Sequence, residues 1–150
     1  MSVAGVAGEF GRCRCRLERA VAGSCEPRAG WPSSVVAAIH AAIELAAADP
    51  GAALTLTDRA GARWRRREPE FVAMVDHFAR LLSRGAPPRN PRLPDPRAVV
   101  ARIARQVNLQ IEAGRAGELR EIAPDLTFLA LLPYVGFAGA RHWSAVPAAA

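Results

Sequence analysis

Residues 123–137 read APDLTFLALLPYVGF, and this stretch decides the fold. Ala123-Pro124-Asp125 marks the start of a helix, because proline is well accepted in a first helical turn. Apolar side chains then occupy nearly every position up to Phe137, so the helix has no polar side. Such a helix has to be covered all round. We therefore expect one side to pack on its own domain and the other on a second copy; the alternative is a central helix in a monomer.

The rest of the chain also predicts helices, with apolar residues spaced three or four apart. The pairs Asp49-Pro50 and Asp95-Pro96 predict helix starts, because aspartate caps and proline fits the first turn. The expected helices cover residues 9–22, 31–48, 50–64, 69–82, 96–113 and 123–137, with a Pro-rich loop at 85–94. Aromatic residues are only 6% and alanine dominates, which disfavours strands.

These features predict an all-α fold of five to six helices, whose last two helices form a four-helix bundle in a dimer. We expect one domain over residues 9–143, with disordered ends at 1–8 and 144–150. The longest uncharged run, residues 126–140, is shorter than the roughly 20 residues of a membrane span. No signal peptide stands out either, so we expect a cytoplasmic protein without membrane contact.

All 20 basic residues are arginine, and against 14 acidic residues they give a net charge of +6. A basic chain is typical of nucleic-acid binding, whereas codon bias explains the same composition if acidic residues are interspersed. The densest cluster is Arg63-Trp64-Arg65-Arg66-Arg67. It predicts either contacts with phosphates and a stacked base, or a solvated helix end.

Catalytic and metal-binding patterns are weak. The three cysteines, Cys13, Cys15 and Cys25, are an odd number and lack the usual zinc-ligand spacing. The three histidines, His40, His77 and His142, form no pair at helical spacing, and no serine lies in a nucleophile-elbow context. We expect no enzyme, no cofactor and no metal site.

Three stretches, in their order along the chain, carry a family resemblance: AAADPGAALTL at 46–56, IEAGRAGEL at 111–119, and IAPDL followed by LLPYVG within 122–136. They resemble the C-terminal domain of TetR-family (tetracycline-repressor-like) transcriptional regulators, over roughly residues 9–143. The resemblance implies an all-α domain whose last two long helices form a dimer bundle. It also implies that the middle helices enclose a pocket for a small apolar effector.

By region, the resemblance assigns two sets of residues. The ligand-binding candidates are Ile39, Trp64, Phe71, Met74 and Phe78. The homodimer candidates are Val99, Ile103, Leu129, Leu132, Pro133 and Phe137. Spacing alone favours ordinary core packing for the first set.

Family members also carry an N-terminal helix-turn-helix that reads the DNA major groove. Only about eight residues precede the region of resemblance here. We therefore expect DNA as a partner only if a helix-turn-helix lies upstream of this sequence. Two other functions stay open. One is a dimerisation module that pairs with an intact relative and disables it. The other is direct nucleic-acid binding through the 63–67 cluster.

Overall fold

The computed structural model describes residues 3–25, 30–57 and 69–147, and within these ranges it confirms the all-α class. No described residue lies in a strand. The helices are α1 (Val3–Ser24), α2 (Trp31–Ala48), α3 (Pro50–Thr57), α4 (Pro69–Ser83), α5 (Pro96–Glu112), the 3₁₀ turn η2 (Ala116–Glu118) and α6 (Leu119–Ser144).

The helix starts follow the expected local chemistry. Asp49 Oδ1 accepts a hydrogen bond from the backbone N–H of Ala52 at 3.0 Å, which caps α3. Asp95 Oδ1 accepts from the N–H of Ala98 at 2.9 Å and caps α5. In both cases proline is the first helical residue, where its missing N–H removes no helical hydrogen bond. The two Asp-Pro starts are therefore confirmed.

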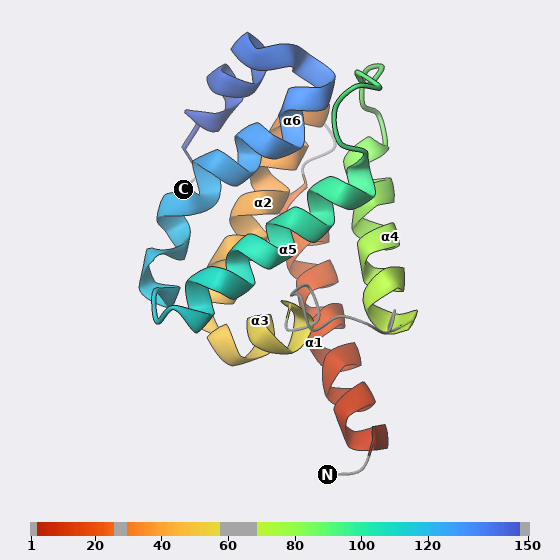
Figure 1. Cartoon of the computed structure of the whole chain (residues 1–150), viewed down its shortest axis with the longest axis vertical. Helices are drawn as coiled ribbons and strands as arrows, with labels where there is room; N and C mark the ends of the chain where they lie inside the picture. Colours follow the sequence, from red (N-terminus) through yellow and green to blue (C-terminus); the bar gives the residue numbers. More distant parts are fainter. Residues whose placement is uncertain (1–2, 26–29, 58–68, 148–150) are drawn as a thin grey trace.

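Helices α2 and α6 pack against each other through the centre of the domain, and α5 runs alongside the first part of α6 (Figure 1). Helix α1 packs on α2 and α3, and α4 packs on α5. The core divides into two clusters of buried residues. The main cluster is Val35, Val36, Ile39, Ile43, Ala46, Ala53, Leu82, Val99, Val107, Leu119, Ala123, Leu126, Ala130, Leu131 and Ala140. The aromatic cluster is Phe10, Cys13, Leu56, Phe71, Met74 and Val75, with Leu17, Ala52, Phe78 and Val100 packed against it.

Three helix boundaries differ from the expected ones. Helix α1 begins at Val3, six residues before the expected start, and α6 extends from Leu119 to Ser144. Pro124 lies inside α6 because, so close to the helix start, it removes only the hydrogen bond to the carbonyl of Arg120. The remainder of the third expected helix, residues 58–64, lies outside the described residues, as does the 63–67 arginine cluster.

Helix α6 is bent near its expected end. Gly136 has φ 73° and ψ 179°, a backbone conformation that glycine adopts without strain from a Cβ atom. This break frees the carbonyl of Pro133 from its helical partner, and the backbone N–H of Asn90 donates to that carbonyl at 2.7 Å. The loop between α4 and α5 therefore contacts α6 at the bend. Residues 137–144 continue as a short helical segment that turns back over one end of the domain (Figure 1).

Candidate functional site

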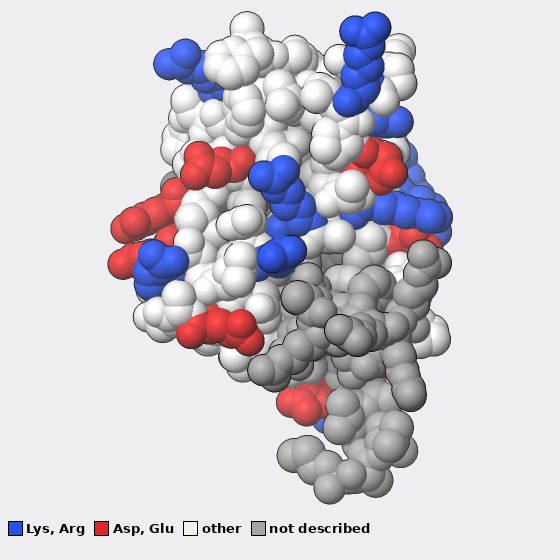
Figure 2. Space-filling model, viewed as in Figure 1, with Lys and Arg blue, Asp and Glu red and all other residues white. Residues whose placement is uncertain are grey.

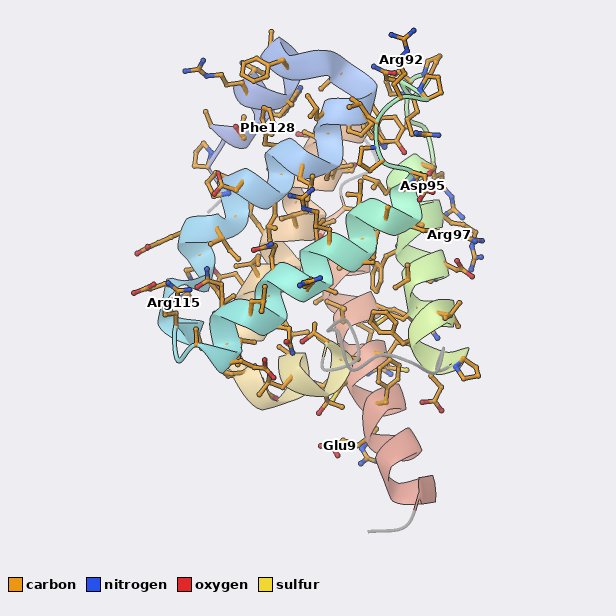
Figure 3. The ribbon with its side chains drawn as sticks, viewed as in Figure 1. Glu9, Arg92, Asp95, Arg97, Arg115 and Phe128 are labelled. Atoms are coloured by element: carbon orange, nitrogen blue, oxygen red, sulfur yellow. The ribbon has the colours of Figure 1, made fainter. Side chains whose placement is uncertain are left out.

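The outward side of α6 is apolar and incompletely covered. Phe128, Leu129 and Leu132 are half-buried, and the side chain of Phe137 is 64% exposed. The rings of Phe128 and Phe137 meet edge to face, with centroids 5.5 Å apart and an interplanar angle of 79°. We call these four residues the α6 face. Figure 3 labels Phe128 on α6, and in Figure 2 the surface over the upper part of this helix carries few charges.

The homodimer candidates fall into two groups. Val99 is only 1% exposed and Pro133 is buried, so both pack within the chain's own domain. Ile103 is half-buried and packs against the main cluster. Leu129, Leu132 and Phe137 belong to the α6 face. Phe128 was not among the homodimer candidates predicted from the sequence. Its spacing could have identified it, because Phe128 and Leu132 are four residues apart and therefore lie on one side of a helix.

The ligand-binding candidates are only partly brought together. Phe71 and Met74 are buried in the aromatic cluster, with Phe78 packed against it. Ile39 lies in the main cluster. Trp64 lies outside the described residues. The structure thus joins Phe71, Met74 and Phe78 and separates Ile39 from them.

An open hollow of about 470 Å³ lies between α1 and α3, next to the aromatic cluster. Its lining includes Cys13, a member of the aromatic cluster, and Ala52, which packs against that cluster. Arg12, Arg16 and Asp49 form a charged rim. A second open hollow of about 600 Å³ follows the outer side of α1 past Arg12, Cys15 and Arg19. Phe71, Met74 and Phe78 line neither hollow.

An ion pair joins two of the charged side chains at the rim of the first hollow. Arg16 Nη1 lies 2.7 Å from Asp49 Oδ2, and this hydrogen bond lowers the pKa of Asp49 below its ordinary value. The pKa of the Cys13 thiol is raised, first by burial and then by the nearby carboxylate of Glu9. Cys13 therefore stays a protonated apolar side chain at neutral pH. These properties suit binding more than nucleophilic chemistry.

The remaining histidine and cysteine side chains build no recognisable centre. Within the described ranges, no three His, Cys, Asp or Glu side chains gather at metal-binding distances. His77 Nε2 lies 3.8 Å from Glu18 Oε1, and Glu18 accepts a 2.6 Å hydrogen bond from Arg14. Cys13 is buried, Cys15 exposed and Cys25 half-buried, and none of them forms a disulfide with another described cysteine.

Two helices are long and apolar enough to cross a membrane, judged by length and composition only. They are α2 and the segment from Ala116 to Ser144 that contains α6. Core helices of water-soluble proteins have the same properties, and these two helices pack on each other here. No protein family, curated protein or solved structure matches this chain.

Proposed function

We propose that the chain is the ligand-binding and dimerisation domain of a cytoplasmic transcriptional regulator of the TetR type. The observation that carries the proposal is the poor coverage of α6. Phe137 on α6 is a large apolar side chain that is 64% exposed, and Phe128, Leu129 and Leu132 on the same helix are only half-buried. Exposed apolar surface costs roughly 25 cal/mol per Å², so a second copy that covers the α6 face stabilises both chains.

The α6 face has the layout of a protein interface. Its apolar part, with Phe128 and Leu132, lies beyond the first turns of α6, where Glu121 and Asp125 are exposed. An apolar centre beside charged residues is typical of interfaces between subunits. Helix α5 runs antiparallel to α6 and packs on it, as two of the four helices in a dimer bundle require (Figure 1). Arg102 and Arg105 on α5 are exposed, so α6 supplies most of the apolar contact.

The aromatic cluster is the proposed effector site. Met74 and the phenyl rings of Phe71 and Phe78 can rearrange around an apolar guest, because methionine is flexible and polarisable. The hollow between α1 and α3 offers an entry, since Cys13 and Ala52 belong to both the hollow and the cluster surroundings. Binding would then favour one arrangement of α1 over another and change the spacing of DNA-reading heads in an intact regulator.

The oligomeric state tests the dimer directly. Sedimentation equilibrium at 1–100 µM is expected to show a dimer, and Phe137→Glu should weaken the dimer at least tenfold. Because Phe137 is exposed in the monomer, the substitution should leave the fold intact. Ala73→Glu is the matched control, since it adds the same charge at an exposed position of α4. A wild-type protein that stays monomeric at 100 µM would refute the dimer.

The effector site has its own test. Decanoic acid, decanol and naphthalene serve as apolar probes, and at least one should raise the thermal midpoint by linkage. Phe78→Ala should reduce that rise, because it removes a half-buried ring from the aromatic cluster. An unchanged midpoint with all three probes would exclude the aromatic cluster as the site. It would leave the dimer unaffected.

A further inference from the structure

One long stretch of this chain, besides the short 63–67 cluster, carries arginines with almost no acidic residues. Residues 77–111 contain seven arginines and a single acidic residue, Asp95. The rest of the chain carries thirteen arginines and thirteen acidic residues, so the entire net charge of +6 resides in this stretch. Codon bias raises the arginine content everywhere, but it does not remove acidic residues from one segment. The scarcity of acidic residues among these arginines therefore needs an explanation specific to this stretch.

The structure places these arginines on neighbouring elements, with uncharged and acidic side chains between some of them (Figure 2). They come from the second half of α4, the loop after it and the outward side of α5, which packs on α4. Six of the seven are exposed: Arg80, Arg84, Arg92, Arg97, Arg102 and Arg105. In Figure 2 blue side chains gather at the upper right and in the middle of the view, and Figure 3 places Arg92 on the loop and Arg97 beside α4. We call this the basic surface.

Contacts with acidic groups leave most of this charge free. Arg97 Nε lies 2.7 Å from Asp76 Oδ1, which joins the first turn of α5 to α4. Asp76 and Arg80 are four residues apart and lie on one side of α4, and Arg84 follows directly after the helix end at Ser83. Within the described ranges, Arg80, Arg84, Arg92, Arg102 and Arg105 form no ion pair. Asp95, the one acidic residue of the stretch, caps α5.

The chain's own acidic surface is too weak to neutralise this charge in a second copy. Residues 112–125 hold four acidic residues but also two arginines. One of those arginines, Arg120, binds the carboxylate of Glu44 through two hydrogen bonds of 2.6 and 2.8 Å. Part of the basic surface, Arg80 on α4 with Arg84 and Arg92 in the loop after it, also lies outside the α5–α6 pair of the proposed dimer bundle. A separate polyanion is therefore the better match.

We propose that the basic surface binds the phosphate backbone of a nucleic-acid duplex, without reading its sequence. The guanidinium group suits this ligand, because its planar fork donates two parallel hydrogen bonds to one phosphate and stays charged at every physiological pH. Each neutralised phosphate releases condensed counterions, which favours binding at low salt. This proposal goes beyond a ligand-controlled dimer, since it gives the domain its own contact with nucleic acid.

Fluorescence anisotropy with a labelled 24-base-pair DNA duplex tests the proposal. With four phosphate contacts, affinity should fall about 10²-fold between 50 and 200 mM NaCl. The fourfold variant Arg80→Gln, Arg84→Gln, Arg102→Gln, Arg105→Gln should bind at least tenfold more weakly at 50 mM and show a shallower salt dependence. Glutamine retains helix propensity, so the fold should persist. If the fourfold variant does not fold, two double variants replace it in the same measurement. One is Arg80→Gln with Arg84→Gln, and the other is Arg102→Gln with Arg105→Gln.

The control removes the same charge elsewhere: Arg12→Gln, Arg19→Gln, Arg115→Gln, Arg141→Gln, all at exposed positions. It should bind within about threefold of the wild type. Equal losses in both fourfold variants would overturn the proposal, because net charge alone would then explain binding. A loss confined to Arg65→Gln with Arg66→Gln would overturn it in favour of the 63–67 cluster. Binding to phosphatidylserine vesicles but not to the duplex would also overturn it.

Discussion

The two clusters of the core contain different types of side chain. The main cluster joins α2, α5 and α6 mostly through aliphatic side chains, and Leu119, Leu131 and Ala140 are fully buried in it. The aromatic cluster joins α1, α3 and α4 through Phe10, Phe71, Met74 and the Cys13 thiol. Small and branched side chains pack helices closely, whereas rings and thioethers fill irregular space and adapt. In the proposed function, the main cluster maintains the fold and the aromatic cluster accepts the effector.

Shortening one buried side chain in each cluster should give the largest losses of stability. It also tests whether the two clusters differ in rigidity. Leu131→Ala is expected to lower the free energy of unfolding by about 3–5 kcal/mol, because Leu131 is fully buried and its rigid neighbours cannot close the cavity. Met74→Ala should cost about 2 kcal/mol, since the surrounding flexible side chains relax. Urea unfolding measures both. A loss at Met74 as large as that at Leu131 would mean that the aromatic cluster is equally rigid.

A buried polar contact joins α5 to α3 and should give the next largest effect. Asn108 Nδ2 on α5 donates to Thr57 Oγ1 on α3 at 3.3 Å, and both side chains are buried. Asn108→Leu should cost about 1–3 kcal/mol, because it removes the donor and leaves the Thr57 oxygen without it. Adding Thr57→Val should recover part of this loss, since both partners are then apolar and similar in shape.

A double-mutant cycle from urea unfolding isolates the coupling between Asn108 and Thr57. A positive coupling supports a specific bond between α5 and α3. If the two single losses simply add, the contact contributes nothing to the packing of α5 on α3 beyond the two side chains taken separately.

The helix starts could be predicted from the sequence, whereas contacts between segments far apart in the chain could not. Asp49-Pro50 and Asp95-Pro96 predicted helix starts because capping depends on neighbouring residues only. The sequence predicted a helix end near residue 137, whereas the structure has a bend at Gly136 and the helix continues to Ser144. The hydrogen bond from Asn90 to the Pro133 carbonyl could not be foreseen, since it joins segments about forty residues apart.

The candidate site was only partly predictable for the same reason. Phe71, Met74 and Phe78 lie on one helix, so their spacing was enough to group them. Ile39 lies on α2, and only the packing of helices decides which cluster it enters. Val99 was expected at a dimer interface, but the contact of α5 with its own domain already buries it. The charge of residues 77–111 was visible in the sequence and is missed when charge is judged over the whole chain.

The smallest predicted effect comes from two exposed ion pairs, one beside each cluster. Arg120 holds Glu44 between α6 and α2, and Arg16 holds Asp49 between α1 and the start of α3. Hydrogen bonds from these arginines lower the pKa of Glu44 and of Asp49 in the folded state. A lowered folded-state pKa adds stability above the unfolded-state pKa, and this stability is lost as pH falls through the folded-state pKa. Both contributions should therefore be complete at pH 7 and fade below about pH 4.5.

Glu44→Gln and Asp49→Asn test the two pairs separately, because asparagine still caps a helix while losing the charge. Each variant should be slightly less stable than the wild type at pH 7, and the difference should decrease as the pH falls towards 3 and shrink in 1 M NaCl. Asp49 also accepts the Ala52 N–H, which further lowers its pKa, so its difference should persist to lower pH than that of Glu44. Urea midpoints at pH 7, 5, 4 and 3 measure this order. A difference that stays constant across these pH values would show that the substitutions act through packing rather than through charge.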